Sequence, residues 1–226
     1  MSQVSHPYGY RLVTLRDWKS RWFSSKQNQY RDLLRADVLI REYLEKRLKG
    51  LFVADIEFER GRKATRVLLH TSRPGMLIGR SGEGAQKLRD DVLRFMRKKK
   101  ITIPTDFKID VVEIQQPEAN AMIVAQMVEE SLRRRMPFRR VIKQMIEKVV
   151  AIREVKGARI VVSGLVGGSA SMSRTEQVKR GPIPLQFIRA DVDYAALAVA
   201  QMGIGIKVWI NKGDSLENKT NKEKNS

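Results

Sequence analysis

PGMLIGRSGEGAQKL, residues 74–88, is the stretch that decides the fold. A proline and an apolar run lead into Gly79 and Gly82, with Arg80 and Ser81 between them, and a charged amphipathic pattern follows. Because glycine has no Cβ atom, such a loop can press its amide groups against phosphates. The N-terminus of the following helix adds partial positive charge, and Arg80 adds a full one. The stretch therefore predicts a contact with a nucleic-acid backbone.

The residues on either side of the loop predict a succession of helices and strands. We expect a helix over 30–49, strands over 55–60 and 65–70, a short helical turn after Pro74, a helix over 83–97 and a strand over 108–114. A glycine loop between a strand hairpin and an amphipathic helix is typical of the KH clamp on the nucleotide backbone. The alternative interpretation is a plain turn between helices, which needs one glycine in the left-handed region. The second glycine and Arg80 favour the clamp, whereas the similar pair at Gly164 and Gly167 lacks this setting.

Composition supports a polyanionic partner. The 226 residues include 44 Lys and Arg against 25 Asp and Glu, which gives a net charge of +19. A charge of this size is typical of proteins that bind nucleic acid. The chain has no cysteine, which excludes disulfides, thiolate metal sites and a thiol nucleophile. The longest apolar run, 194–200, is far below the roughly 20 residues that span a bilayer, so we expect a soluble intracellular protein.

A proline at position 117 breaks the patterns on both sides and predicts a domain boundary. We expect an α+β protein with a basic arm over 1–29, a first domain over 30–116, a second over 117–212 and a disordered polar tail over 213–226. In the second domain, two amphipathic helices on a mixed sheet are predicted. The helices are expected over 119–135 and 138–153, and the strands over 158–163, 174–177, 187–194 and 204–211.

The start of the second of these helices carries a separate basic site. Arg139 and Arg140 fall in its first turn, where the helix dipole disfavours cations, and Lys143 lies one turn beyond Arg139. Local stability does not explain them, so the three residues predict a positive ridge for a phosphate backbone. The preceding run, 133–135, is different because cations at the C-terminus of a helix complement its dipole.

Several strings together resemble one known family over nearly the whole chain up to Gly213. In order they are HPYGYRL, WKSRWF, TSRPGMLIGRSGE, MPFRRVIKQ, GARIVVSG, SRTE, PLQFIRADVDYA and GIKVWINKG. They are similar to the bacterial family of small ribosomal subunit protein three. The loop over 164–173 and the segment before the last strand depart from the family pattern, which leaves the contacts of that loop open.

The resemblance implies an N-terminal KH domain of the prokaryotic type (type II) and a C-terminal α+β domain. It also implies a place in the cytoplasm, in the head of the small ribosomal subunit, where the protein binds ribosomal RNA and neighbouring ribosomal proteins. The family lines the channel where messenger RNA enters and assists the unwinding of structured messenger. The residues that match these roles are Gly79, Arg80, Ser81 and Gly82 for RNA, and Arg139, Arg140 and Lys143 for messenger. Further candidates for RNA contacts are Arg11, Arg133, Arg134, Arg135 and Arg174.

Two other functions stay open on the sequence alone. A free KH-type RNA-binding regulator or assembly factor would carry the same loop. An enzyme would have to use Asp191 and Asp193, which lie on one side of a strand, but Arg189 is a ready ion-pair partner for them. His6 and His70 fit no metal or catalytic spacing. We therefore expect no enzyme activity, no cofactor and no metal.

Overall fold

The computed structural model describes residues 6–214, apart from 13, 62–63, 103, 105 and 166–171. Most of the divergent loop at 164–173, and the predicted tail beyond Asp214, thus lie outside the described residues. The described chain forms two compact units. The glycine-loop unit is Trp18–Gln115, and the C-terminal unit combines Met1–Asp17 with Gln116–Ser226.

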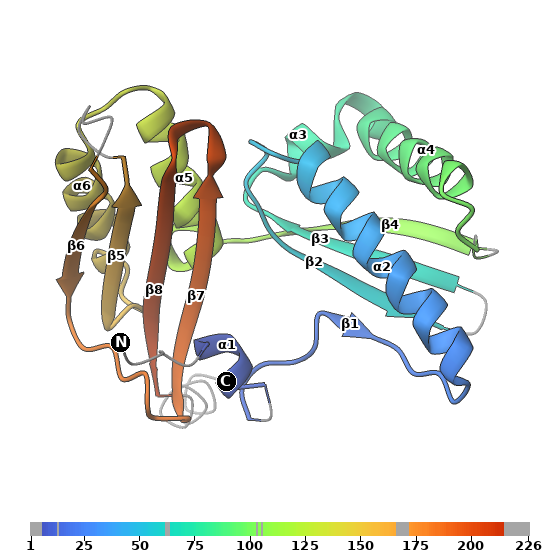
Figure 1. Ribbon diagram of the computed structural model, residues 1–226, viewed down its shortest axis with the longest axis horizontal. Coiled ribbons are helices and arrows are strands. Elements are labelled where there is room, and N and C mark those ends of the chain that lie inside the picture. Colours follow the sequence, from blue (N-terminus) through green and yellow to red (C-terminus); the bar gives the residue numbers. More distant parts are fainter. Residues whose placement is uncertain are drawn as a thin grey trace. The chain divides into compact units, whose positions relative to one another are not determined.

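The glycine-loop unit is a four-stranded sheet with helices packed on one face (Figure 1). Its elements are β1 (Ser20–Arg21), α2 (Gln27–Arg47), β2 (Val53–Arg60), β3 (Ala64–Thr71), α3 (Pro74–Ile78), η1 (Arg80–Gly82), α4 (Glu83–Lys98) and β4 (Asp106–Glu113). The sheet order follows the chain, with β2 and β3 antiparallel and the β1–β2 and β3–β4 pairs parallel. The glycine loop is therefore the connection between α3 and α4.

Apolar spacing explains how the helices of this unit are attached. Leu88, Val92 and Met96 recur every fourth residue along α4 and are buried. They share one core with α2 and with the alternating inward residues of the strands, such as Phe58 and Val67. This core holds α4 on the sheet and fixes the helix end that carries the glycine loop.

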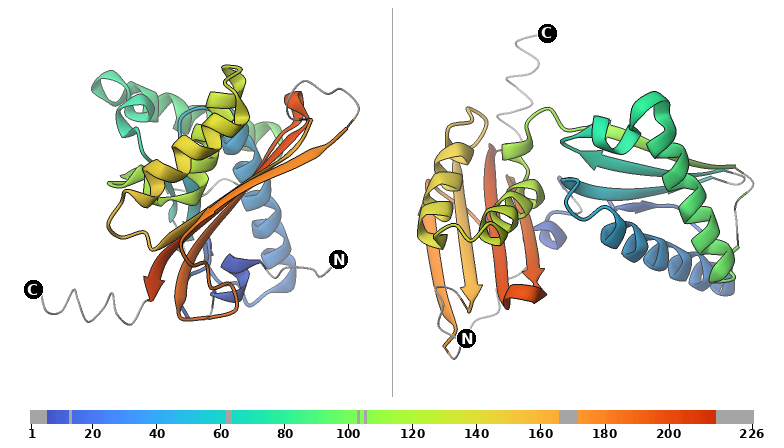
Figure 2. Two further views of the ribbon diagram at one scale, coloured as in Figure 1. Left: turned by 90° about the vertical axis from the view of Figure 1, so that its left-hand side faces the viewer. Right: turned by 90° about the horizontal axis from the view of Figure 1, so that it is seen from above.

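The C-terminal unit is a second four-stranded sheet, covered on one face by two helices (Figure 2). Its elements are α1 (Pro7–Tyr10), η2 (Pro117–Ala119), α5 (Ala121–Arg133), α6 (Phe138–Val150), β5 (Gly157–Gly164), β6 (Arg174–Arg180), β7 (Ala190–Val199), η3 (Ala200–Met202) and β8 (Ile204–Asp214). The strand order is β6-β5-β8-β7. The predicted α+β class is confirmed, but this sheet is antiparallel throughout, where a mixed sheet was expected.

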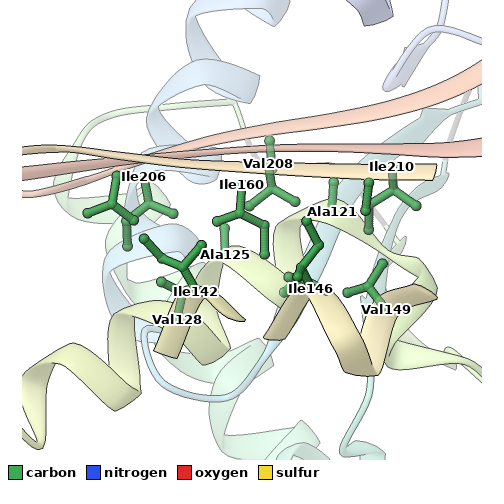
Figure 3. Packing of buried hydrophobic residues seen from close by; sticks show 14 of the residues in the cluster. Ala121, Ala125, Val128, Ile142, Ile146, Val149, Ile160, Ile206, Val208 and Ile210 are labelled. Carbon is green, nitrogen blue, oxygen red and sulfur yellow. The ribbon is translucent and has the colours of Figure 1, made fainter. Parts of the chain in front are cut away.

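The core between these helices and this sheet is almost entirely aliphatic. Figure 3 shows Ala125 and Val128 of α5 and Ile142 of α6 facing the strand residues Ile160 and Ile206. Branched residues alternate along β5 and β8, so one face of each strand is buried by the helices. Within the described part of the chain, no helix is both long and apolar enough to cross a membrane.

Two segments differ from the sequence-based expectation. Residues 6–17 of the predicted arm belong to the C-terminal unit, where α1 packs beside β7. The strand expected over 187–194 begins only at Ala190, and Phe187 is exposed. The carbonyl groups of Pro184, Leu185 and Phe187 accept hydrogen bonds from the Arg11 side chain instead of from a neighbouring strand.

Candidate nucleic-acid interface

Both glycines of the loop have positive φ angles, which residues with a Cβ atom rarely adopt. Gly79 ends α3 with φ +70°, and Gly82 precedes α4 with φ +81°. A Cβ atom at Gly82 would meet no other atom within 4 Å, so its backbone angle alone requires glycine there. Two tight turns in succession therefore need two glycines. The presence of the second glycine is thus explained by the turn itself, and the case for an RNA clamp rests on the surrounding charges.

A third glycine, Gly84, which was not among the predicted site residues, is required by the close packing of the loop. A Cβ atom at Gly84 would lie 2.5 Å from the carbonyl oxygen of Leu77 and 2.9 Å from that of Ile78. Gly84 therefore permits the close approach of α3 and α4 that shapes the loop. The sequence contains a signal for this role: the last glycine of GRSGEG falls inside the predicted helix, where glycine is otherwise unfavourable.

The loop presents positive charge to solvent beside the N-terminal end of α4. Arg80 is exposed and, among the described residues, has no acidic partner. Ser81 lies beside it in η1. Gly82 stands at the N-cap of α4 and supplies no side-chain acceptor to the first-turn amides. Glu83, the first residue of α4, forms an ion pair of 3.6 Å with Lys87, one turn later in the same helix. An anion at this helix end would meet amides, the helix dipole and a guanidinium together.

The predicted ridge on α6 is exposed opposite the buried face of the helix. Val141 and Ile142 are buried, whereas Arg139, Arg140 and Lys143 face solvent. Arg139 forms an ion pair of 2.9 Å with a glutamate of β6, but its side chain is 71% exposed, so the pair contributes little stability. In the described part of the chain, Arg140 and Lys143 have no acidic partner. The ridge therefore keeps two cations without acidic partners, and one of them, Arg140, lies in the first turn of the helix, where the dipole disfavours it.

The arginine run before the ridge divides into paired and unpaired residues. Arg133 pairs with Glu129 at 2.8 Å, and Arg134 pairs with Glu130, each one turn along α5. Arg135 is exposed and has a left-handed backbone, with φ +58°. Its amide and that of the next residue bond back to carbonyls in the last turn of α5, which is the Schellman arrangement that normally ends in glycine. Within the described residues only Arg135 of the three is unpaired.

Replacing Arg135 with glycine is expected to raise the free energy of unfolding by about 1 kcal/mol, because the left-handed strain disappears. Urea unfolding followed by circular dichroism measures the change. Arg134→Gly is the matched control: Arg134 has φ −75°, so glycine there should destabilise the helix end. Equal shifts in the two variants would contradict the strain that we assign to Arg135.

Arg174 extends the ridge along the sheet edge. It is the first residue of β6 and is exposed. Side chains two apart on a strand share a face, so Arg174 lies on the same face as Glu176 and Arg180. Glu176 pairs with Arg139 of α6 at 2.9 Å, and Arg180 pairs with Glu147 of α6 at 3.2 Å. This face of β6 therefore borders the helix. Earlier residues of β6 pair with earlier residues of α6, and Arg174 precedes both paired residues. Arg174 therefore lies toward the start of α6, beside the ridge.

Arg11, in contrast, is not available as an RNA contact, which corrects the sequence-based expectation. Its side chain is 0% exposed and donates to the carbonyl oxygens of five residues. The acceptors are Ala190, Pro7, Pro184, Leu185 and Phe187, at 2.6 to 3.3 Å. Burial lowers the pKa of Arg11 from its usual value. This guanidinium fastens the N-terminal segment to the C-terminal unit.

The two aspartates of β7 also have structural roles. Asp191 pairs with Arg16 at 2.7 Å, and Asp193 lies 3.8 Å from the same guanidinium; Arg16, not Arg189, is the partner. Burial opposes the charge of Arg16, but the two carboxylates outweigh it and raise its pKa. Asp193 also accepts a hydrogen bond of 2.9 Å from the amide of Ala121 at the start of α5. Across the described residues, no group of three or more acidic or histidine side chains is arranged to hold a metal ion.

Comparison with known proteins assigns both units. Residues 39–119 match the family model described as KH domain, and residues 128–210 match that described as Ribosomal protein S3, C-terminal domain. "Small ribosomal subunit protein uS3" of Clostridium novyi is 39% identical over 222 residues, which cover 97% of this chain and 96% of the relative. The proteins of the same name from Pseudomonas paraeruginosa and Magnetococcus marinus are 42% and 41% identical, covering 95% and 97% of this chain and 90% and 100% of theirs. The chain therefore belongs to the family of small ribosomal subunit protein uS3.

Proposed function

We propose that the protein holds ribosomal RNA in the head of the small subunit through its glycine loop and guides messenger RNA past the ridge on α6. Membership in the uS3 family makes the chain a structural protein of the ribosome in the cytoplasm, and not an enzyme. The domain limits that we propose, 30–116 and 117–212, enclose the greater part of each unit. Its partners in this proposal are ribosomal RNA, messenger RNA and neighbouring proteins of the small subunit.

The glycine loop would hold RNA by its backbone. Amides at the start of α4 and the exposed Arg80 offer hydrogen bonds and charge to phosphate oxygens. None of these groups reads a base edge, so the contact would position RNA without selecting its sequence. A structural protein that must hold one site of a large folded RNA can rely on such contacts, because the RNA fold supplies the specificity.

The observation that carries the messenger role is the exposure of Arg140 and Lys143 without acidic partners, with Arg140 in the first turn of α6, where cations are unfavourable. Long cationic side chains on one helix face bind phosphates of either strand of an RNA. Cations that hold separated strands favour the open state over the paired one, and they need no motor or nucleotide hydrolysis. Arg139 and Arg174 would widen the same surface.

The test is the triple variant in which Arg139, Arg140 and Lys143 become alanine. Thermal stability should be unchanged or slightly raised, because the removed cations oppose the helix dipole. Small subunits should still assemble around the variant. Translation of a messenger with a stable downstream hairpin should slow severalfold, while an unstructured messenger is read at nearly the normal rate.

Lys148→Ala serves as the control, since Lys148 is an exposed cation in the last turn of the same helix. It should slow neither messenger. If the triple variant unfolds, or slows both messengers equally, the ridge has a structural role or acts elsewhere. A regulator outside the ribosome would be indicated if the wild-type protein were substoichiometric on small subunits and removed by a high-salt wash.

A further inference from the structure

A second strongly basic surface lies at the opposite end of α4 from the glycine loop. Arg97, Lys98, Lys99 and Lys100 follow one another at the C-terminal end of this helix, and all four are exposed. We call this segment the basic turn. None of its four side chains has an acidic partner among the described residues. The uS3 role proposed above uses the other end of the helix and leaves this surface unexplained.

The nearest acids along the chain are already occupied. Asp91, about two turns earlier in α4, lies 3.5 Å from Arg47 and 3.7 Å from Arg94. Asp106, at the start of β4, pairs with Lys108 at 3.2 Å. The positive charge of the basic turn is therefore not neutralised by these neighbours.

Helix stability accounts for only part of the cluster. Arg97 and Lys98 lie in the last turn, where cations complement the helix dipole. Lys100 has φ +53°, a left-handed conformation that glycine adopts without strain. Its amide bonds to the carbonyl of Arg97, and the amide of Ile101 bonds to that of Met96, which is the Schellman arrangement. A lysine thus occupies the position where glycine is favoured, beside three like charges.

The shape of the basic turn favours a flexible polyanion. Successive residues of a helix are rotated by about 100° from one another, so the side chains from Arg97 to Lys99 spread over more than one side of the helix end. A flat protein surface would meet only some of them, whereas an RNA backbone can bend around them. Between Asp91 and Lys100 no large hydrophobic side chain is exposed, so the segment lacks the apolar anchors of protein interfaces.

We propose that the basic turn binds the sugar–phosphate backbone of RNA as a second contact, separate from the glycine loop. The 16 residues of α4 place the two ends of the helix about 24 Å apart (Figure 2). One helix then holds RNA at both ends: at its N-terminus by amides and Arg80, and at its C-terminus by four cations. The proposal rests on the RNA-binding role given above and assigns a further site to it.

The experiment uses the full chain with Arg97, Lys98, Lys99 and Lys100 changed to glutamine. Binding is measured at several salt concentrations with oligouridine of about four nucleotides, the length that a KH clamp holds, and with an oligouridine several times longer. The variant should bind the short RNA like the wild type. For the long RNA, affinity at low salt should fall roughly tenfold, and the slope of log affinity against log salt should flatten by about 0.7 for each lost phosphate contact.

A matched control removes four positive charges at scattered exposed positions of the chain. Its substitutions to glutamine are at Lys46, Lys148, Arg153 and Lys207. A smaller variant, Lys99→Gln with Lys100→Gly, relieves the left-handed lysine and should lose about half as much slope while remaining folded. This pair keeps the test valid if the quadruple variant is poorly folded.

Four results are distinguishable. Loss of affinity and slope in the basic-turn variants, beyond that of the control, supports the proposal. Equal behaviour of the quadruple variant and the control, with the wild type binding RNA, overturns it and leaves the glycine loop untouched. Failure of the wild type to bind either RNA overturns the RNA-binding role itself. If the basic-turn variants bind RNA normally but lose cross-links to an acidic protein in assembled subunits, the surface contacts protein and the proposal is wrong.

Discussion

Replacing Arg11 with methionine should lower the free energy of unfolding of the C-terminal unit by roughly 3–5 kcal/mol, a range typical for breaking a buried charged network. Methionine fills a similar volume but donates no hydrogen bond. The five carbonyl oxygens that now accept from the guanidinium would lose their donor, and two of these bonds are fully buried. The segment before β7 and the turn α1 should loosen together.

Hydrogen–deuterium exchange of the amides of β7 and β8 in increasing urea measures this change, because these strands report on the C-terminal unit alone. Arg11→Lys should rescue little, since an ammonium group has three donors and lacks the planar geometry that reaches several carbonyls. Arg174→Met is the control at an exposed site and should change stability by less than about 0.5 kcal/mol. A loss below about 1 kcal/mol in Arg11→Met would contradict the role that we assign to this residue.

The elements of the fold could be predicted because their signals are local. Leu88 and Val92 are four residues apart, which is helical spacing. In β2 and β3 apolar residues such as Phe58 and Val67 alternate with polar ones. Periodicity alone therefore located α4 and the hairpin. The exposed ridge on α6 followed from the same spacing, because the buried residues Val141 and Ile142 determine which face remains for cations.

What could not be predicted depends on contacts between distant residues. Arg11 meets residues more than 170 positions away, and nothing in its local sequence distinguishes a buried arginine from one that binds RNA. In the same way, the sequence offered Arg189 as the partner of Asp191, whereas the fold brings Arg16 there. The antiparallel pairing of β7 and β8 also arises from the topology, because strand patterns alone do not give direction.

Charge at an RNA-binding site can act on stability and affinity in opposite directions, and the glycine loop offers a direct test of this. In the variant Arg80→Asp with Ser81→Asp, Gly79 and Gly82 keep their positive φ angles, so the loop should retain its shape. Acidic residues before a helix N-terminus complement the dipole, so stability should be unchanged or raised by about 0.3–1 kcal/mol. The same charges would face phosphates, and affinity for RNA should fall roughly 100-fold, or about 2.7 kcal/mol.

Filter binding at fixed low salt and thermal unfolding of the same preparations measure the two effects. The matched control is Gln86→Asp with Arg89→Asp, which makes the same change in charge at exposed positions within α4. Its RNA affinity should fall much less, because Gln86 and Arg89 lie about one and two turns past Gly82, farther from the phosphates that the loop would hold. A structural loop without an RNA role would show no such difference between the two variants. Equal RNA affinity of the loop variant and the control, both folded, would mean that Gly79 and Gly82 form only a turn and that RNA is held elsewhere on the basic surface.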